Sequence, residues 1–160
     1  MTPTSARLTL HLIAPAEARR IVSGSPNPSD RWHPAYPLED ELDPLRSLAD
    51  DSDPDPVFGL YRIQLLASGL AIGGIGFFGP PDEDGSVELG FGLVAPARGH
   101  GYATEALQAA VRIAAAHGAQ RVKADTAPGN AASQRVLENG GFRQVSRSPG
   151  LVYYMRELRR

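Results

Sequence analysis

The chain has 160 residues, which is enough for one domain with a sizeable hydrophobic core, and its 42% apolar content is ordinary. It contains no cysteine, which excludes disulfides, thiolate metal sites and a cysteine acyl-enzyme. A net charge of −2 gives no basis for binding nucleic acid or a membrane surface, and because no signal-peptide core or membrane-spanning run is present we expect a cytoplasmic protein.

The first third of the chain predicts a strand over residues 8–13 and a short helix that Pro15 opens over residues 15–22. Residues 24–56 are rich in Pro, Asp and Ser, and leucines at helical spacing from 38 to 48 predict some helix within them. Trp32, His33 and Tyr36 gather in this segment. We expect them either to wall a substrate pocket or to anchor a long loop.

A meander of strands follows over residues 57–66, 70–78 and 87–94, with turns at 67–69 and 80–85. On the third strand, Glu88, Gly90 and Gly92 are expected to share one face because side chains alternate along a strand. The two glycines leave space there for a ligand to approach the backbone closely.

The third strand runs into a glycine-bearing turn, Arg98-Gly99-His100-Gly101, and an amphipathic helix over residues 102–117 follows at once. Unpaired N–H groups and the positive end of the helix dipole then meet at one point, which predicts an anion site with Arg98 as an added cation. A P-loop is excluded because no lysine follows Gly101. A dinucleotide fingerprint over residues 90–95 is excluded because it lies inside the strand and meets Pro96.

The remaining elements are a strand over 121–126, a helix that Asn130 opens and Gly140 or Gly141 ends, and strands over 142–147 and 151–157. Strands that first form a meander and then alternate with helices predict an α/β (α+β) fold. We expect a single domain over residues 1–160, with a mixed sheet and helices on both faces.

Two motifs in this order carry a resemblance to a known family. The spacing Arg98-x-x-Gly101-x-Ala103 resembles the coenzyme A pyrophosphate motif of the GNAT superfamily of N-acetyltransferases, and the segment from Asn130 to Phe142 is similar to its downstream signature. The resemblance implies a largely antiparallel GNAT-type sheet and acetyl-CoA as cosubstrate. It also implies direct acetyl transfer to a primary amine of a small molecule or a protein N-terminus, and it is nearest to the branch that acetylates ribosomal-protein N-termini.

The resemblance also implies a set of cofactor-binding residues. Backbone N–H groups near Leu93, Val94 or Ala95 are expected to hold the acetyl carbonyl and the pantetheine arm, because a splayed strand leaves its donors free. Asn130 is expected to contact the cofactor arm or simply to cap its helix. The full set is Leu93, Val94, Ala95, Arg98, Gly99, His100, Gly101, Tyr102, Ala103, Thr104, Asn130 and Ser133.

Acetyl transfer needs a neutral amine, a polarised carbonyl and a protonated leaving thiolate. Glu88 is the first candidate for the base, and its alternative is an ordinary carboxylate at a hairpin edge. Many superfamily members carry a tyrosine where this chain has Leu137, so Ser133 is the candidate acid, with capping, a water or no acid as alternatives. The four histidines show no ligand spacing, so we expect no metal.

Two further classes of function stay open at this point. One is a non-catalytic acyl-CoA-binding sensor on the same fold, and the other is an enzyme that uses another acyl-CoA or an oxygen acceptor. The sequence has no motif that identifies the acceptor, and it allows a monomer or a homodimer.

Overall fold

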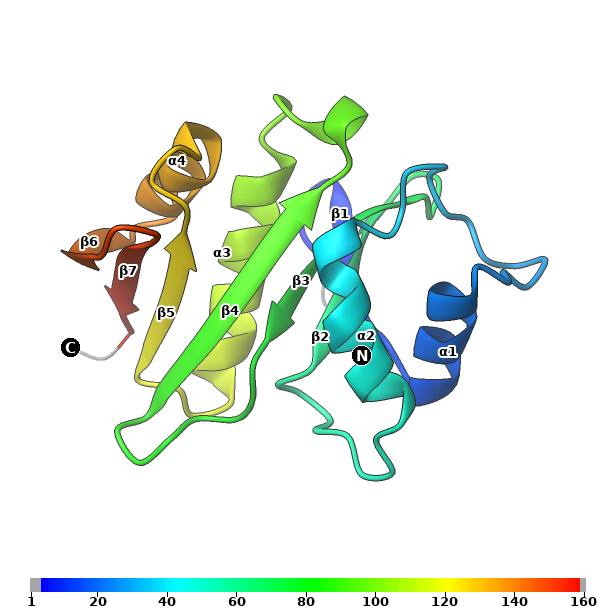
Figure 1. Ribbon diagram of the computed structural model, residues 1–160, viewed down its shortest axis with the longest axis horizontal. Coiled ribbons are helices and arrows are strands. Elements are labelled where there is room, and N and C mark those ends of the chain that lie inside the picture. The colour runs from blue at the N-terminus through cyan, green and yellow to red at the C-terminus, as the bar shows by residue number, and fades with distance from the viewer. Residues whose placement is uncertain (1–3, 159–160) are drawn as a thin grey trace.

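The computed structural model describes residues 4–158, and seven strands in this part form one continuous sheet (Figure 1). The strands are β1 (Leu8–Leu12), β2 (Leu60–Leu65), β3 (Ala71–Phe77), β4 (Ser86–Leu93), β5 (Arg121–Thr126), β6 (Arg143–Arg147) and β7 (Val152–Glu157). Their order across the sheet is β1-β2-β3-β4-β5-β7-β6, and only the β4–β5 pair is parallel. The predicted mixed, largely antiparallel sheet is therefore confirmed.

Helices cover both faces of the sheet, as predicted. Helices α1 (Pro15–Ser23) and α2 (Leu42–Ala49) lie on one face, while α3 (Tyr102–Ala116) lies on the other with α4 (Ala131–Asn139) near the end of β5 (Figure 1). Two single turns of 3₁₀ helix, η1 (Glu39–Glu41) and η2 (Ala95–Ala97), precede α2 and α3.

Helix α3 packs closely on the sheet because its buried face is built largely from alanine. The small side chains let the helix backbone approach the strands, and bulkier Leu107, Val111 and Ile113 fill the remaining space. The residues of this buried face are Ala106, Leu107, Ala109, Ala110, Val111, Ile113 and Ala114. The helix start, which carries the predicted anion site, is thereby held firmly against the end of β4.

The sheet opens between β4 and β5. Their ladder begins at Ser86–Arg121 and ends at Glu88–Lys123, although both strands continue beyond it. Figure 1 shows the two strands diverging toward their carboxyl ends, with α4 and the turn before α3 on either side of the opening. Beyond Glu88 and Lys123, the facing edges of β4 and β5 have backbone groups that do not pair with each other.

The second predicted strand begins later in the structure than expected. Strand β2 begins at Leu60 rather than at 57, because Asp55 accepts hydrogen bonds from the N–H groups of Val57 and Phe58 and holds them in a turn. The predicted helix within residues 24–56 is present as η1 and α2. Across residues 4–158, no helix combines the length and the apolar character that a membrane crossing requires.

Candidate active site

The turn between β4 and α3 has the geometry of an anion site. Gly99 and Gly101 both adopt left-handed backbone conformations, with φ of 83° and 79°, which side chains with a Cβ rarely adopt. Glu105 is the first residue of α3 whose N–H is paired within the turn, to the Gly101 carbonyl at 3.1 Å. The N–H groups of Tyr102, Ala103 and Thr104 therefore lack intrahelical partners and point out of the helix start.

Two arginines flank this turn, and the sequence indicated only one of them. The Nε of Arg98 donates to the carbonyl of Leu93 at 3.1 Å, which fixes the guanidinium at the end of β4. Arg7, just before β1, donates to the carbonyl of His100 at 2.9 Å, and its guanidinium lies 4.5 Å from the ring centre of Tyr102. Both cations stand beside the unpaired N–H groups.

Arg7 is held in place by Glu105 in the first turn of α3. Glu105 accepts hydrogen bonds from the backbone and the Nε of Arg7, each at 2.8 Å, and from the hydroxyl of Ser5. Burial alone would raise the pKa of Glu105, but these hydrogen bonds and the charge of Arg7 lower it. The ion pair fastens the N-terminal strand to the turn and keeps the turn in one conformation.

A groove of about 550 Å³ starts at this turn and runs between α3 and α4. Asn130 caps α4, with its Oδ1 accepting from the N–H of Ser133 at 3.1 Å, and both residues line the groove. The predicted cofactor residues on the lining are Leu93, Arg98, Gly99, Gly101, Tyr102, Ala103, Thr104, Asn130 and Ser133. His100 is absent from the lining, and its carbonyl instead binds Arg7.

Backbone donors on the open edge of β4 differ from the prediction in one respect. The N–H of Val94 donates to the carbonyl of Ile72 at 2.8 Å, so it is not free to bind a ligand. Because hydrogen-bonding directions alternate along an antiparallel strand, the N–H groups of Phe91 and Leu93 point the other way, into the fork with β5. This corrects the expectation for Val94. Ala95 lies in η2 and outside the groove lining.

A second cavity, of about 500 Å³, lies on the α2 side of the fork. Most of its wall is apolar, and it includes the backbone of the glycines on β3 and β4 together with Leu38, Leu45 and Phe78. The two hollows share Leu38, Asp40, Phe91, Gly92, Asn130 and Ser133. They therefore meet at the open edge of β4, and Ser133 stands at the junction.

Glu41 places a carboxylate in the second cavity. Its carboxylate lies against the backbone of Gly74 on β3, so closely that a Cβ on Gly74 would stand 2.7 Å from Oε2. Burial raises the pKa of Glu41 from 4.5 to about 7, an effect that a hydrogen bond from the Leu38 backbone opposes and the charge of Asp40 reinforces. This carboxyl group is therefore close to half ionised at neutral pH.

Glu88, the predicted base, lies at the closed end of the fork. Its side chain is exposed and is not part of the lining of either cavity. Burial raises its pKa, as do a hydrogen bond with the Asp125 side chain and the negative charge of Asp125. Asp125 itself lines the second cavity, so Glu88 reaches the cavity only through this neighbour.

The predicted aromatic cluster lies behind the cavity wall. Tyr36 is 5% exposed, its ring centre is 6.2 Å from that of Trp32, and neither these two residues nor His33 belongs to either lining. The expectation that they contact the acceptor therefore stays a prediction that these two linings do not support. The parts of the segment that do reach the cavity are Leu38, Asp40 and Glu41.

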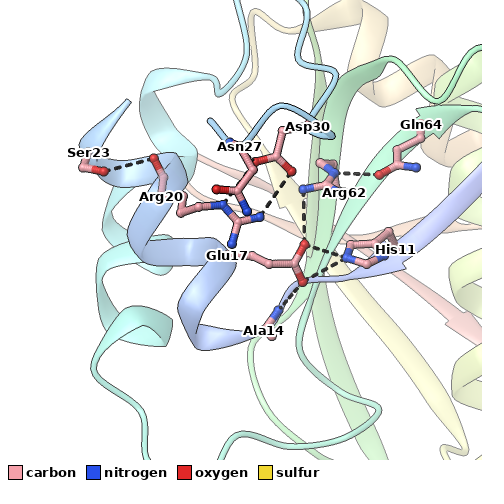
Figure 2. Close-up of polar contacts among 9 residues, drawn as sticks. All are labelled: His11, Ala14, Glu17, Arg20, Ser23, Asn27, Asp30, Arg62 and Gln64. Atoms are coloured by element: carbon pink, nitrogen blue, oxygen red, sulfur yellow. Dashed lines mark hydrogen bonds and ion pairs between the residues drawn. The ribbon is translucent and has the colours of Figure 1, made fainter. Parts of the chain in front are cut away.

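Polar contacts hold this irregular segment against α1 and β2 (Figure 2). Asp30 accepts from Nε and Nη2 of Arg20 on α1, at 3.1 and 3.2 Å, and from the N–H of Asn27 at 2.8 Å. Glu17 of α1 binds His11 of β1 at 2.8 Å and lies 3.5 Å from Arg62 of β2. The Asp30 contacts tie the irregular segment that leads into Glu41 to α1.

Comparisons with known proteins agree with this geometry. The family model of the acetyltransferase (GNAT) domain matches residues 7–143. The chain belongs to the GNAT acetyltransferase family. The uncharacterized N-acetyltransferase YjdG of Bacillus subtilis (strain 168) is 39% identical over 72 residues, a match that spans 44% of this chain and 43% of that protein.

Solved structures of GNAT proteins share the fold over nearly the whole chain. A GNAT-family acetyltransferase from Bacillus anthracis superposes with a TM-score of 0.68 at 17% identity, with 98% of both chains covered. Ribosomal-protein-S5-alanine acetyltransferase from Vibrio fischeri reaches 0.69 at 15% identity, with 98% of this chain and 96% of that chain covered. At these identities the likeness concerns the fold. The family match and the partial match to the curated relative point to an N-acetyltransferase domain.

Two residues of this GNAT site escaped the sequence analysis. Glu41 had a detectable signal, because it falls on the apolar stripe formed by Leu38, Leu45 and Leu48, where a carboxylate is out of place. Arg7 had none, since it lies far along the chain from the turn that it contacts. Within residues 4–158 no group of three or more His, Asp or Glu side chains is placed to hold a metal ion.

Proposed function

We propose that this protein is an acetyl-CoA-dependent N-acetyltransferase that moves the acetyl group directly to a primary amine of a small molecule or a protein N-terminus. The observation that carries the proposal is the meeting of two hollows at the open β4–β5 fork. One hollow starts at an anion-binding turn, and the other contains a buried carboxylate. Direct transfer requires both substrates at one point, and this arrangement provides it.

The cofactor side suits a pyrophosphate followed by an extended arm. The unpaired N–H groups of residues 102–104 and the guanidinium of Arg98 fit two phosphates, and the left-handed glycines allow close approach. In this proposal the N–H of Leu93 donates to the thioester carbonyl, which stabilises the negative charge that develops there. Asn130 and Ser133 line the path of the arm toward the fork.

The reaction needs one group to take a proton from the amine and one to give a proton to the leaving thiolate. Ser133 is the proposed donor because it stands where the two hollows meet. Glu88, acting through Asp125, is the base that the sequence indicated, and Glu41 is the carboxylate inside the cavity.

The proposed domain spans residues 1–160. The family match begins at residue 7, and β6 and β7 complete the same sheet. A cytoplasmic location and a monomer or homodimer belong to the same proposal. The ribosomal-protein branch is one form of it, supported by the fold shared with the Vibrio fischeri enzyme.

The test is release of free thiol from acetyl-CoA in the presence of alkylamines, N-terminal peptides and aminoglycosides. We expect thiol release to depend on both the protein and an amine, with a matching acetylated product in mass spectrometry. Tight binding of acetyl-CoA with no turnover on any amine would instead support the non-catalytic sensor.

A further inference from the structure

The cavity on the α2 side of the fork contains a carboxylate in a mostly apolar wall, and this contrast suggests what it binds. We propose that Glu41 is the general base and the anchor for the amine, and that the acceptors are primary monoamines with an apolar body. The inference rests on the acetyl-transfer function proposed above and names its base and its substrate class.

The position of Glu41 places it within reach of the reacting atoms. Its carboxylate lies on Gly74 of β3, and Gly74 pairs with Gly92 of β4. Neighbouring strands are about 4.8 Å apart, so the carboxylate is one strand away from the edge of β4 that the proposed thioester carbonyl would occupy. Gly92 lines both hollows, which makes this the place where amine and thioester meet.

The absence of side chains at Gly74 and Gly92 is what makes room for this arrangement. A Cβ on Gly74 would collide with the Glu41 carboxylate, and one on Gly92 would stand 2.6 Å from Cδ1 of Leu38. The space above Gly74 is therefore filled by the Glu41 carboxylate, and the space above Gly92 is filled by Leu38. Because Gly74 has no Cβ, the carboxylate of Glu41 can lie directly on the surface of the sheet.

The backbone that carries Glu41 is held in position by its surroundings. The N–H of Glu41 donates to the carbonyl of Leu38 at 3.0 Å, and Leu45 on the next turn is buried in the core. Among residues 4–158 no side chain or backbone group makes a hydrogen bond to Oε1, although this atom is buried. A buried carboxylate oxygen without a partner is costly, and an ammonium group in the cavity would supply the missing donor.

The charges around Glu41 suit a base that acts near neutral pH. Burial raises the pKa of Glu41 to about 7, and Asp40 on the same turn adds to the effect. Tyr36 faces Glu41 from the preceding segment, and the charges of Arg62, Glu17 and Asp30 reach this tyrosine from β2, α1 and the loop. A base is most effective when its pKa lies close to the working pH.

The Glu41 carboxylate takes one proton from the bound ammonium, and the neutral nitrogen then attacks the thioester carbonyl carbon. The C–S bond breaks, and the thiolate leaves with the C–S bonding pair. The second nitrogen proton passes to this thiolate, with Ser133 as the proposed relay, so the products are an amide, free coenzyme A and one proton held by Glu41.

The wall of the cavity indicates the rest of the acceptor. Leucine, isoleucine and phenylalanine are its commonest side chains, and the carboxylates of Asp40, Glu41 and Asp125 are its acidic groups. A volume of about 500 Å³ holds a small molecule or one terminal side chain of a peptide. Asp40 and Asp125 are exposed, so Glu41 is the one of these three carboxylates with a buried, unpaired oxygen. A single cation with an apolar body matches this wall, whereas a polyamine or an aminoglycoside would bury further charges or hydroxyl groups without partners.

The first experiment compares Glu41→Gln with Asp43→Asn in the full chain. Asp43 is the matched control because it is acidic, two residues away and fully exposed, with only Arg46 as a partner. We expect Glu41→Gln to lower kcat on hexylamine by about 100-fold or more, with unchanged acetyl-CoA affinity in calorimetry, and Asp43→Asn to stay within about twofold. Wild-type kcat/KM should fall as pH drops through about 7, and Glu41→Gln should lose this limb.

Glu88→Gln separates the two candidate bases. Wild-type kcat and an intact acid limb in Glu41→Gln would overturn the proposal, and it would be equally overturned if Glu88→Gln alone removed the acid limb. If Glu41→Gln is inactive and has also lost acetyl-CoA binding, the variant is misfolded, and Glu41→Asp then tests the proposal. Its carboxylate stops about 1 Å short of the glutamate position, so Glu41→Asp should keep the acid limb at a reduced kcat. Loss of that limb in Glu41→Asp would refute the base role.

The second experiment tests the substrate class with propylamine, butylamine, pentylamine and hexylamine. We expect kcat/KM to rise roughly fourfold for each added methylene until the cavity is filled, since each buries apolar surface. Ethanolamine and spermidine should be poorer than the alkylamine of equal length. A flat series with good turnover would refute the apolar acceptor while leaving acetyl transfer in place. No turnover on any amine would refute the proposed function itself.

Discussion

A glycine pair on β3 offers a sharp test of the role of Glu41. A Cβ on Gly74 would stand 2.7 Å from Oε2 of Glu41, and ordinary contact begins at 3.4 Å, so Gly74→Ala must push the carboxylate away by about 0.7 Å (3.4 − 2.7). The obstacle is the end of a flexible side chain, so the free energy of unfolding should change by less than about 1 kcal/mol. A misplacement of about 1 Å can cost on the order of 100-fold in rate, so we expect kcat to fall roughly 10- to 100-fold.

Gly73→Ala is the matched control on the same strand. Its Cβ would stand 2.2 Å from the carbonyl oxygen of Gly92 and 3.0 Å from the Cα of Leu93, so two strands must separate. Overpacking of this kind costs about 1–3 kcal/mol, and each kcal/mol lowers Tm by about 2–4 °C in a domain of this size. Gly73→Ala should therefore show a clear drop in Tm, and Gly74→Ala should not.

The assays are steady-state thiol release with a saturating alkylamine and scanning calorimetry of the free protein. Gly74→Ala should lower activity without lowering stability. If Gly74→Ala keeps the wild-type kcat and the same acid limb, the carboxylate over Gly74 takes no part in the reaction. If it loses as much Tm as Gly73→Ala, its lower activity reflects damage to the sheet.

Three further predictions concern the cofactor turn and the buried carboxyl group. Arg98→Ala should weaken coenzyme A binding by about 1–3 kcal/mol in calorimetry, while Arg112→Ala on the exposed face of α3 should not; equal affinity in both would remove Arg98 from the site. Gly101→Val should abolish coenzyme A binding. Gly24→Val, at a similar left-handed φ of 68° far from the groove, should lower stability only. Coenzyme A binding retained by Gly101→Val would contradict the phosphate role of the turn. Because the folded pKa of Glu41 is about 7 and the ordinary value of a glutamate is 4.5, the folded chain holds the extra proton, so the free energy of unfolding should fall as pH rises between these values. Urea unfolding should show a flatter pH dependence in Glu41→Gln, and an unchanged slope would argue against the raised pKa.

The pattern of elements could be predicted because each depends on neighbours in the sequence. The alanine stripe of α3, the capping by Asn130 and the left-handed glycines of the turn are local features, set by backbone geometry and helical periodicity. The anion site belongs to the same class, since a turn that opens a helix creates unpaired N–H groups wherever it occurs. These features also brought the family resemblance into view.

Which backbone groups stay free is a question that the sequence leaves open. Val94 and Leu93 are adjacent, yet the N–H of Val94 is bonded to Ile72 while that of Leu93 points into the fork. The difference depends on the register of β3 against β4 and on the point where β4 parts from β5. Both are properties of strand pairing between distant segments.

The long-range contacts of the site were likewise decided by the tertiary structure. Arg7 and Glu105 lie 98 residues apart in the sequence and meet only because β1 and the start of α3 lie side by side in the fold. Trp32 and Tyr36 form a conspicuous aromatic cluster but turn inward, whereas Glu41, one of several acidic residues nearby, turns into the cavity. The sequence by itself determined the helices, the turn and most of the predicted cofactor residues that line the groove beside it. The acceptor side depended on how residues 24–41 pack across the sheet, because burial and the pKa of a carboxyl group arise from neighbours in space rather than along the chain.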